Sequence, residues 1–196
     1  MTSTATGASG SSVRDRFRAG VEAASSTYLE QPDWAAVVAH VAAGTDVVAL
    51  APSLAADEPD LLVALEAAGC GIVIPDQDDP AASVADVAVA LVQGELAIAE
   101  TGSVLVSEHR LGDRVVTMLC RRLVQVVPAD RLVDRLEGAA DWLAARGGQP
   151  GFASLMTGPS RTADIERSLT IGVQGPDEVE VIVLTATTGA PTEGTA

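Results

Sequence analysis

Apolar side chains recur at helical spacing along much of the chain. Trp34, Val37, Val38 and Val41 fall at positions i, i+3, i+4 and i+7 of one helix face, and Pro32-Asp33 just before them is typical of a helix start. The same spacing, with capping residues and glycines at segment ends, predicts helices over residues 13–29, 33–44, 58–68, 81–92, 130–146 and from about 160 to 171. Residues 115–120 are expected to form a short helix or an irregular apolar stretch.

Short apolar runs separate these helical segments. They predict strands over residues 46–52, 72–75, 123–128, 152–156 and 178–184. Two further runs flank Glu100-Thr101-Gly102 and predict a hairpin over residues 94–106, in which Gly102 supplies a positive φ. Helices that alternate with strands imply βαβ units with right-handed crossovers. We therefore expect an α/β fold with a mostly parallel sheet flanked by helices, and ligands at the strand ends.

The last predicted strand carries charge on one face. Glu178, Glu180 and Ile182 point to one side, and Val179, Val181 and Val183 point to the other. Two charges on one face suggest an edge strand or a partly open sheet face. Beyond the predicted elements, residues 1–12 and 185–196 are small and polar, and we expect both tails to be disordered.

The composition fits one domain and excludes several functions. The 196 residues are 47% hydrophobic but only 3% aromatic, so the core must consist of Ala, Val, Leu and Ile. All 12 basic residues are arginines, which rules out lysine-dependent catalysis and the phosphate-binding lysine of P-loops. A net charge of −15 without a basic stripe argues against a nucleic acid partner.

The cysteines and the N-terminal sequence further limit the kind of protein this chain can be. Cys70 and Cys120 match neither a redox CxxC pair nor the spacing of a zinc or iron–sulfur ligand set, so we expect two free thiols and no metal site. No charged segment followed by an apolar stretch begins the chain, and no apolar run approaches the ~18 residues that span a bilayer. These features predict a cytoplasmic protein. His40 and His109 are expected on a helix surface and in an exposed loop, respectively.

The stretch from Met156 to Glu166 is the first candidate site. It is expected to be a strand, a loop and a helix start, with Ser160 or Thr162 as the N-cap. Free N–H groups at such a helix start, together with the Arg161 guanidinium, could hold a phosphate or carboxylate. The alternative is a simple helix cap with Arg161 in water or paired to a nearby carboxylate. A second candidate is Glu100, which could be a solvated hairpin residue or a base that faces a ligand.

Three stretches, Ala97–Ser103, Gly158–Glu166 and Ile171–Pro176, together resemble the LUD-domain proteins, and most of all the C component of bacterial lactate-utilisation systems. The resemblance covers residues 46–184, which would be the LUD domain, preceded by N-terminal helices over 13–45. It implies a fold similar to ribose-phosphate isomerases, glucosamine-phosphate deaminases and CoA transferases. It also implies a role in oxidising L-lactate to pyruvate beside iron–sulfur partner proteins. No cofactor is expected in this chain, because two distant cysteines cannot hold a cluster.

The resemblance also assigns residues. Glu100 becomes the candidate catalytic residue, and the ligand-binding candidates are Thr101, Gly102, Ser103, Gly158, Ser160, Arg161, Thr162, Asp164 and Glu166. We expect the two motifs to meet across one crevice that binds a small anionic metabolite. The chain departs from the family pattern at Cys120-Arg121-Arg122-Leu123, where relatives often carry two prolines and a histidine, and at Glu95, where they tend to have Asp.

Three functions remain open at this point. The chain could be a lactate-utilisation component whose LUD domain binds the metabolite. It could be an isomerase-like or CoA-transferase-like enzyme with Glu100 as base or nucleophile. It could also be a non-catalytic scaffold or sensor for an iron–sulfur partner.

Overall fold

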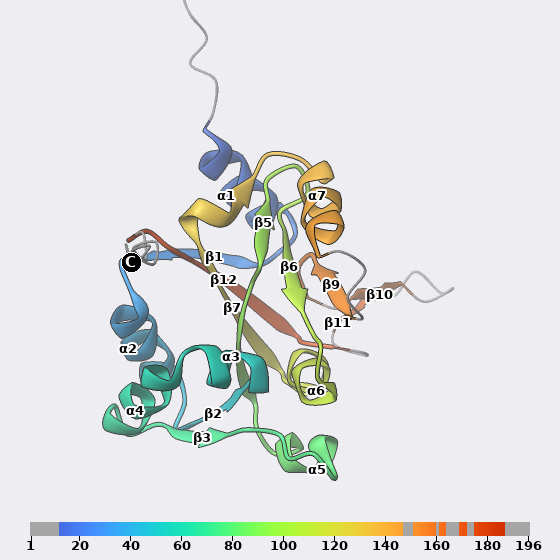
Figure 1. The fold of residues 1–196 in the computed structure, drawn as a ribbon. Coiled ribbons are helices and arrows are strands. Elements are labelled where there is room, and N and C mark those ends of the chain that lie inside the picture. Colours follow the sequence, from blue (N-terminus) through green and yellow to red (C-terminus); the bar gives the residue numbers. More distant parts are fainter. Residues whose placement is uncertain (1–11, 147–150, 160, 164–168, 172–174, 187–196) are drawn as a thin grey trace, which may run out of the picture.

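The protein is described by a computed structural model covering residues 12–146, 151–159, 161–163, 169–171 and 175–186, with only the backbone at 161–163 and 169–171. Its central sheet has six strands: β1 (Thr27–Gln31), β2 (Val47–Leu50), β3 (Gly71–Val73), β4 (Val89–Gln93), β7 (Arg122–Pro128) and β12 (Glu178–Leu184). All neighbouring pairs are parallel, in the order β1-β12-β7-β4-β2-β3 (Figure 1). The predicted mostly parallel sheet is confirmed.

Helices cover both faces of this sheet. They are α1 (Val13–Ala23), α2 (Trp34–Gly44), α3 (Pro52–Asp57), α4 (Pro59–Ala67), α5 (Pro80–Val84), α6 (Leu111–Leu119) and α7 (Glu137–Ala145). Right-handed crossovers place α2 and α4 on one face, where they pack together, and α5 and α6 on the other, where they also pack together. The predicted α/β class with flanking helices is therefore correct.

Local sequence explains where the helices begin. The Asp33 carboxylate accepts a hydrogen bond of 2.9 Å from the Ala36 N–H and caps α2. Pro52, Pro59 and Pro80 each occupy the first turn of a helix, where the missing N–H costs nothing. No helix in the described part of the chain combines the length and apolar character needed to cross a bilayer.

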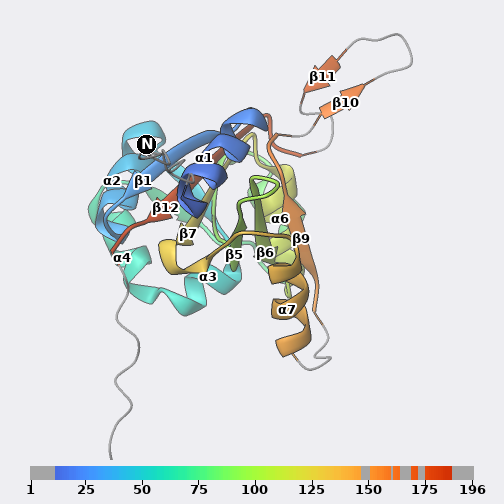
Figure 2. The same ribbon diagram turned by 90° about the horizontal axis from the view of Figure 1, so that it is seen from above.

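A second, smaller sheet packs beside the first. It has the order β8 (Leu132–Val133), β5 (Leu96–Ile98), β6 (Ser103–Ser107) and β9 (Ala153–Met156). The β5–β6 pair is the hairpin that the sequence predicts, and Gly102 has a φ of 66° in its turn. Seen from above, α7 lies next to β5, β6 and β9 (Figure 2). The aliphatic core joins the two sheets, since Val104 and Val106 of β6 belong to the same buried cluster as Leu91 and Val124.

The order of the strands creates a switch point between β2 and β4. From β2 the chain moves outward to β3, and then crosses back over β2 to form β4 on its other side. The loops after β2 and β4 therefore leave in opposite directions and open a crevice at the carboxyl ends of these strands. This is where a ligand site is expected in an open α/β sheet.

Several predicted elements differ from the structure in the N-terminal half. Residues 13–29 were expected to be one helix, but α1 ends at Ala23 and β1 follows, so 13–45 contains a strand of the central sheet. Residues 81–92 form the short α5 and then β4, which is central in the sheet. A strand that is buried on both faces is apolar at every position and does not show the alternation of apolar and polar residues that identifies a half-exposed strand. The spacing of apolar residues therefore could not distinguish β4 from a helix.

Predicted elements in the C-terminal half also differ from the structure. Residues 130–146 form a 3-10 turn (Ala129–Arg131), β8 and then α7 rather than one helix. The helix expected from about 160 to 171 is contradicted, because β10 (Arg161–Ala163) pairs antiparallel with β11 (Leu169–Ile171). The backbone N–H groups of a strand turn to its partner, so the helix N-terminus postulated for anion binding is not formed there. Of the predicted disordered tails, 1–12 and 185–196, residues 1–11 and 187–196 lie outside the described residues. Ser12 caps α1, and the Thr185 and Ala186 N–H groups donate to the carbonyls of Gln31 and Pro32, so these ends of the two tails are ordered.

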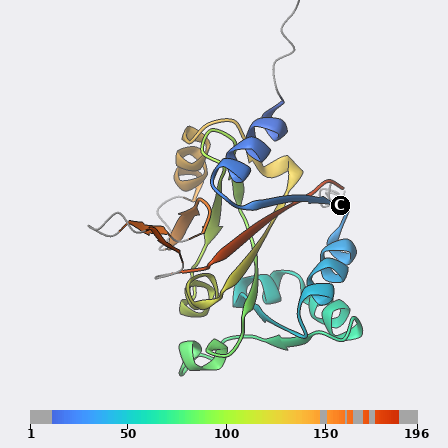
Figure 3. The same cartoon turned by 180° about the vertical axis from the view of Figure 1, so that it is seen from behind.

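The prediction that β12 is an edge strand or has a partly open face is wrong. Seen from behind, β12 lies between β1 and β7 (Figure 3). The buried Glu180 carboxylate accepts hydrogen bonds from Arg122, with Oε2 at 3.0 Å from one guanidinium nitrogen, and contacts the His40 ring. The charge at Glu180 therefore belongs to a buried ion pair and does not mark a sheet edge. An interior strand can carry such a charge when the opposite charge lies on the neighbouring strand.

Candidate functional site

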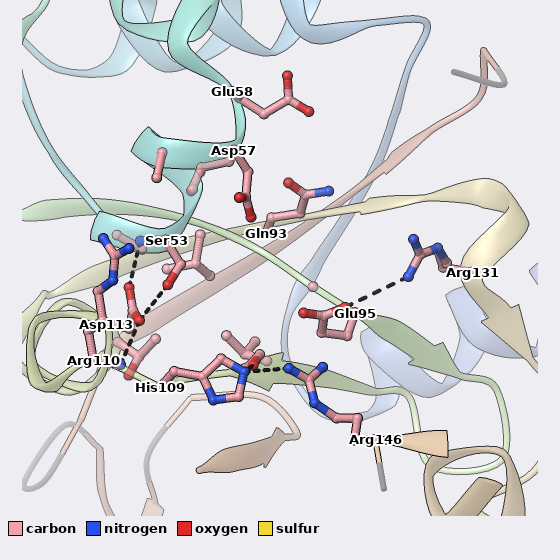
Figure 4. Close-up of a pocket in the computed structure, with 18 residues that line it drawn as sticks. Ser53, Asp57, Glu58, Gln93, Glu95, His109, Arg110, Asp113, Arg131 and Arg146 are labelled. Carbon is pink, nitrogen blue, oxygen red and sulfur yellow. Dashed lines mark hydrogen bonds and ion pairs between the residues drawn. The ribbon is translucent and has the colours of Figure 1, made fainter. Parts of the chain in front are cut away.

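A cavity of about 460 Å³ opens at the switch point between β2 and β4. Its walls are the residues after β2 (Ala51–Glu58), those after β4 (Gln93–Glu95), the end of β6 with the start of α6, and two arginines from beyond β7 and from α7. Its size falls in the range of small-molecule sites, roughly 300–1,000 Å³. Figure 4 shows the side chains that point into it.

One wall is held rigidly by Asp113. This carboxylate is buried and accepts three hydrogen bonds, from the Ser53 N–H at 2.9 Å, the Ser53 hydroxyl at 2.7 Å and the Arg110 N–H at 3.0 Å. Asp113 thus ties the start of α3 to the start of α6 across the cavity. The Arg110 guanidinium donates to the Pro52 carbonyl at 3.3 Å, which leaves most of its N–H groups toward the opening.

The opposite wall contains His109 and Arg146. The Arg146 guanidinium donates to His109 Nε2 at 2.5 Å, and the Ser107 hydroxyl lies 2.7 Å from the same nitrogen. A guanidinium can only donate, so Nε2 is the acceptor in its contact with Arg146. Arg146 also stacks on the Trp142 ring, 4.3 Å from the ring centroid. Among the described side chains no carboxylate forms an ion pair with Arg146 or Arg110.

The remaining wall is acidic. Asp57 and Glu58 stand at the end of α3, and the side chain of Gln93, the last residue of β4, lies near Asp57 (Figure 4). Glu95 is 3.7 Å from Arg131 and is neutralised by it. The cavity therefore has guanidinium groups on two opposite walls, at Arg110 and Arg146, and oxygen acceptors at Asp57 and Gln93. A ligand that carries both an anionic group and hydroxyl donors matches this polarity.

A buried carboxylate, Glu108, directly precedes His109 and Arg110 in the chain. Glu108 is 1% exposed and accepts hydrogen bonds from the hydroxyl of Thr117 and, at 2.5 Å, from that of Ser154. Thr117 also lines the cavity. The Glu108 network therefore fixes α6 and β9 against the end of β6, and so positions His109 and Arg110, which follow Glu108 in the chain.

The first predicted motif lies at the other end of β5 from the cavity. Glu100 is exposed and accepts a hydrogen bond of 3.0 Å from the Leu136 N–H, just before α7. The buried Ser103 hydroxyl contacts the hydroxyls of Thr101, at 2.7 Å, and Thr157. The Ser103–Thr157 contact places the residue before Gly158 next to the first motif. None of the described residues in either motif lines the cavity.

The glycines of both motifs pack against α1. A Cβ on Gly102 would lie 2.2 Å from the carbonyl carbon of Gly20, and one on Gly158 would lie 2.2 Å from the Ala24 carbonyl oxygen. Both have positive φ, 66° and 72°. Only glycine allows both the positive φ and this close contact with the backbone of residues 20–24. Packing is therefore sufficient to explain why both positions are glycine.

The other residues of the second motif cannot be placed with their side chains. Arg161 and Thr162 lie in the backbone of β10, and Figure 2 shows the β10–β11 pair beyond the end of β9. Ser160, Asp164 and Glu166 lie outside the described residues. Arg161, Thr162 and these three stay predicted ligand-binding residues, and Glu100 stays a predicted catalytic residue.

Sequence reasoning missed most of the cavity. It identified the strand ends as ligand positions and noted Glu95 only as a departure from the family pattern. His109 was expected in an exposed loop, and it is exposed, but it also borders the cavity. The signal that could have found the site is Ser107-Glu108-His109-Arg110, four polar residues directly after a buried strand. Arg121 and Arg122, at the start of β7, pair with Asp177 and Glu180 instead.

The two cysteines are free, as predicted, and both are buried. Burial raises the pKa of Cys120 to about 12, and burial followed by the nearby Asp46 raises the pKa of Cys70. Among the described residues no three His, Cys, Asp or Glu side chains are grouped closely enough to hold a metal ion.

We expect both thiols to resist thiol–disulfide exchange in the folded protein. At pH 8 a pKa near 12 lowers the thiolate fraction of Cys120 more than about a thousandfold relative to an exposed thiol. Reaction with a chromogenic disulfide reagent, followed with and without guanidinium, measures this. Fast reaction without denaturant would contradict the buried placement, and a Cys120→Ser variant assigns any residual rate to Cys70.

Comparison with known proteins identifies the family. The model of the LUD domain matches residues 40–184. Proteins named lactate utilization protein C are similar over about half of the chain, at 34% identity in Shouchella clausii and 31% in Anoxybacillus flavithermus, covering 53% and 50% of this chain. The chain covers only 45% and 44% of the length of these relatives.

A solved structure supports the fold. The crystal structure of a DUF162 family protein from Deinococcus radiodurans aligns with a TM-score of 0.62 at 18% identity, covering 88% of this chain and 96% of that one. At this identity the match shows the architecture alone. The family model spans both the β2–β4 switch point and the strands that surround the cavity. The chain belongs to the LUD domain family.

Proposed function

We propose that this protein is a component of L-lactate utilisation and that the cavity between β2 and β4 binds a small organic carboxylate such as lactate or pyruvate. The carrying observation is that Arg110 and Arg146 face one 460 Å³ cavity and form no ion pair with a described carboxylate, in a chain of net charge −15. Two unneutralised guanidinium groups at the switch point of an α/β sheet favour an anionic ligand. The lactate role is supported by the names of the relatives.

The side chains suggest how such a ligand is held. Arg146 stacks on Trp142 and is fixed by His109, so one edge of its planar fork is preorganised for a carboxylate. Arg110 supplies a second set of donors from the other wall. Asp57 and Gln93 offer acceptors for the hydroxyl of a 2-hydroxy acid. This polarity favours lactate over pyruvate, which has a carbonyl oxygen where lactate has a hydroxyl donor.

The oxidation itself requires an electron acceptor. Removing two electrons from lactate needs a redox group, and we propose that it resides in an iron–sulfur partner while this chain binds and orients the metabolite in the cytoplasm. The buried, widely spaced Cys70 and Cys120 fit this division of roles, because they are not positioned as cluster ligands. Glu100 and the second motif would then belong to a separate part of the domain or to the partner-facing surface.

We expect Arg146→Gln to weaken L-lactate binding by about 10- to 100-fold, because charge-assisted hydrogen bonds contribute about 1.5–3 kcal/mol. Thermal denaturation and titration calorimetry with L-lactate, pyruvate and a sugar phosphate measure the effect. Arg121→Gln is the matched control, since its side chain is 78% exposed and pairs with Asp177.

Two outcomes would contradict the proposed site. Equal affinity in wild type and Arg146→Gln would exclude the cavity. Loss of binding in Arg161→Ala with retention in Arg146→Gln would place the anion at the second motif instead. The absence of any ligand-induced stabilisation by millimolar carboxylates would favour a scaffold without a metabolite site.

A further inference from the structure

An apolar groove of about 550 Å³ runs beside the polar cavity, on the surface between the second sheet and α7. Its apolar lining is Leu105, Ala139, Trp142, Leu143, Phe152 and Leu155. Leu143, Phe152 and Leu155 are each about half exposed, at 54%, 50% and 48%. An exposed apolar surface that is concave and of ligand size points to a binding function.

The groove and the polar cavity share His109 and Arg146. Those two residues form the boundary between the two spaces, and Arg146 covers the face of Trp142 at the end of the groove. Apart from this pair, the described lining of the groove carries no charged side chain. The groove therefore has one cationic end and an otherwise apolar surface.

We propose that the groove binds the apolar body of a monocarboxylic acid, aliphatic or aromatic, with about six to ten carbons, whose carboxylate reaches Arg146. Charge complementarity carries the assignment, because the only charged groups in the described groove are at one end and one of them is a permanent cation. The Arg146 guanidinium lies over the Trp142 ring, 4.3 Å from its centroid, and a planar fork of N–H donors matches the geometry of a carboxylate. Leu105, Leu143, Phe152 and Leu155 then contact the hydrocarbon.

The inference goes beyond lactate binding but uses the same cation. Because Arg146 can hold one carboxylate at a time, an apolar acid in the groove excludes a small acid from the polar cavity, and the two ligands compete. Binding of a second class of organic acid in the groove would thus inhibit lactate binding in the cavity.

The first test is a chain-length series on the full chain. Titration calorimetry with butyrate, hexanoate and octanoate should show affinity rising about threefold for each added methylene, somewhat below the roughly fourfold expected for complete burial, because the groove is open. Octanoate should displace L-lactate. Equal affinity for butyrate and octanoate would overturn the proposal.

Matched surface variants locate the effect. Leu143→Gln and Leu155→Gln should weaken octanoate binding at least about fivefold and leave L-lactate binding unchanged, since each removes apolar contact from the groove. Val63→Gln on α4, where the valine is 66% exposed, is the control and should change neither ligand. Octanoate affinity that is unaffected by both leucine variants would overturn the groove assignment.

The same data separate the two proposals. If L-lactate does not bind but octanoate binds and loses affinity in Leu143→Gln, the groove stands and the lactate site fails. If L-lactate binds through Arg146 and octanoate binds no better than butyrate, the lactate site stands and the groove fails.

Discussion

Replacing Gly102 with alanine should lower the free energy of unfolding by about 3–4 kcal/mol. Two costs add up. Alanine at a φ of 66° is strained by about 1–2 kcal/mol, and overpacking a closed contact costs about 1–3 kcal/mol. The new Cβ would lie 2.2 Å from the Gly20 carbonyl carbon and 2.5 Å from the Val21 nitrogen, which are backbone atoms of α1 that cannot rotate away. Urea denaturation at equilibrium measures the loss.

Gly69→Ala is the matched control for this substitution. Gly69 has a φ of 80°, but a Cβ there meets no atom within 4 Å. Its cost should therefore be the strain alone, about 1–2 kcal/mol. Similar losses in the two variants would show that α1 does not lie against the hairpin as described.

The Gly102 result also bears on the family motif. The Glu-Thr-Gly-Ser sequence is a recognisable part of the resemblance to LUD-domain proteins, and the simplest assumption is that all of it contacts a ligand. The structure gives its glycine a different role, because the hairpin must approach α1 more closely than any side chain permits. A large stability loss with unchanged lactate affinity in the remaining folded protein would separate the two roles.

Arg122→Met should destabilise the protein by about 3 kcal/mol. The Glu180 carboxylate on β12 is only 6% exposed and is neutralised by Arg122 of the adjacent β7, at 3.0 Å. Among the described residues, removing the arginine leaves a buried charge supported by the His40 ring alone, and breaking a buried pair in this way costs about 3–5 kcal/mol. The partial exposure of Arg122 places the expected value at the lower end. Urea denaturation at neutral pH measures it.

The neighbouring arginine provides the control. Arg121 is 78% exposed and pairs with Asp177 at 3.3 Å, so Arg121→Met should cost less than about 1 kcal/mol. The double variant Arg122→Met/Glu180→Met should recover most of the loss, because replacing both partners removes the unpaired charge. If the double variant is as unstable as Arg122→Met, the loss comes from packing and the ion-pair explanation is wrong.

These arginines lie where the resemblance to LUD-domain proteins leads us to expect two prolines and a histidine. Neither faces the cavity, because the amino end of β7 lies at the edge of the sheet opposite the carboxyl ends of β2 and β4. Arg122 instead neutralises a buried glutamate. In this chain the segment thus contributes to the stability of the sheet, and the cationic groups of the candidate site come from the start of α6 and the end of α7.

The sequence by itself determined the class of fold and the family. Apolar strands that alternate with amphipathic helices indicate an α/β fold. Both patterns can be read from the sequence because each depends only on residues a few positions apart. Asp33 capping α2 and Gly102 turning the β5–β6 hairpin were correctly identified for the same reason. Long motifs in the right order also identified the LUD domain, which the family comparison confirms over residues 40–184.

Tertiary structure decided the elements whose local pattern is ambiguous. Val89–Gln93 became a strand because it is buried on both sides between β2 and β7, where a helix cannot pair. Glu180 became an interior residue because Arg122 on the next strand neutralises it. Arg161–Ala163 became a strand because Leu169–Ile171 pairs with it. Each outcome depends on a partner distant in the sequence or on a strand order that local spacing cannot encode.

The candidate site was decided in the same way. Ser53, Gln93, Arg110 and Arg146 are far apart in the sequence and have no shared pattern, yet they border one cavity. They meet because β4 forms on the opposite side of β2 from β3, which opens the crevice, and because α7 brings Arg146 to His109. The sequence predicts that ligands bind at strand ends; only the order of the strands determines which ends meet, and hence which side chains can bind the same molecule.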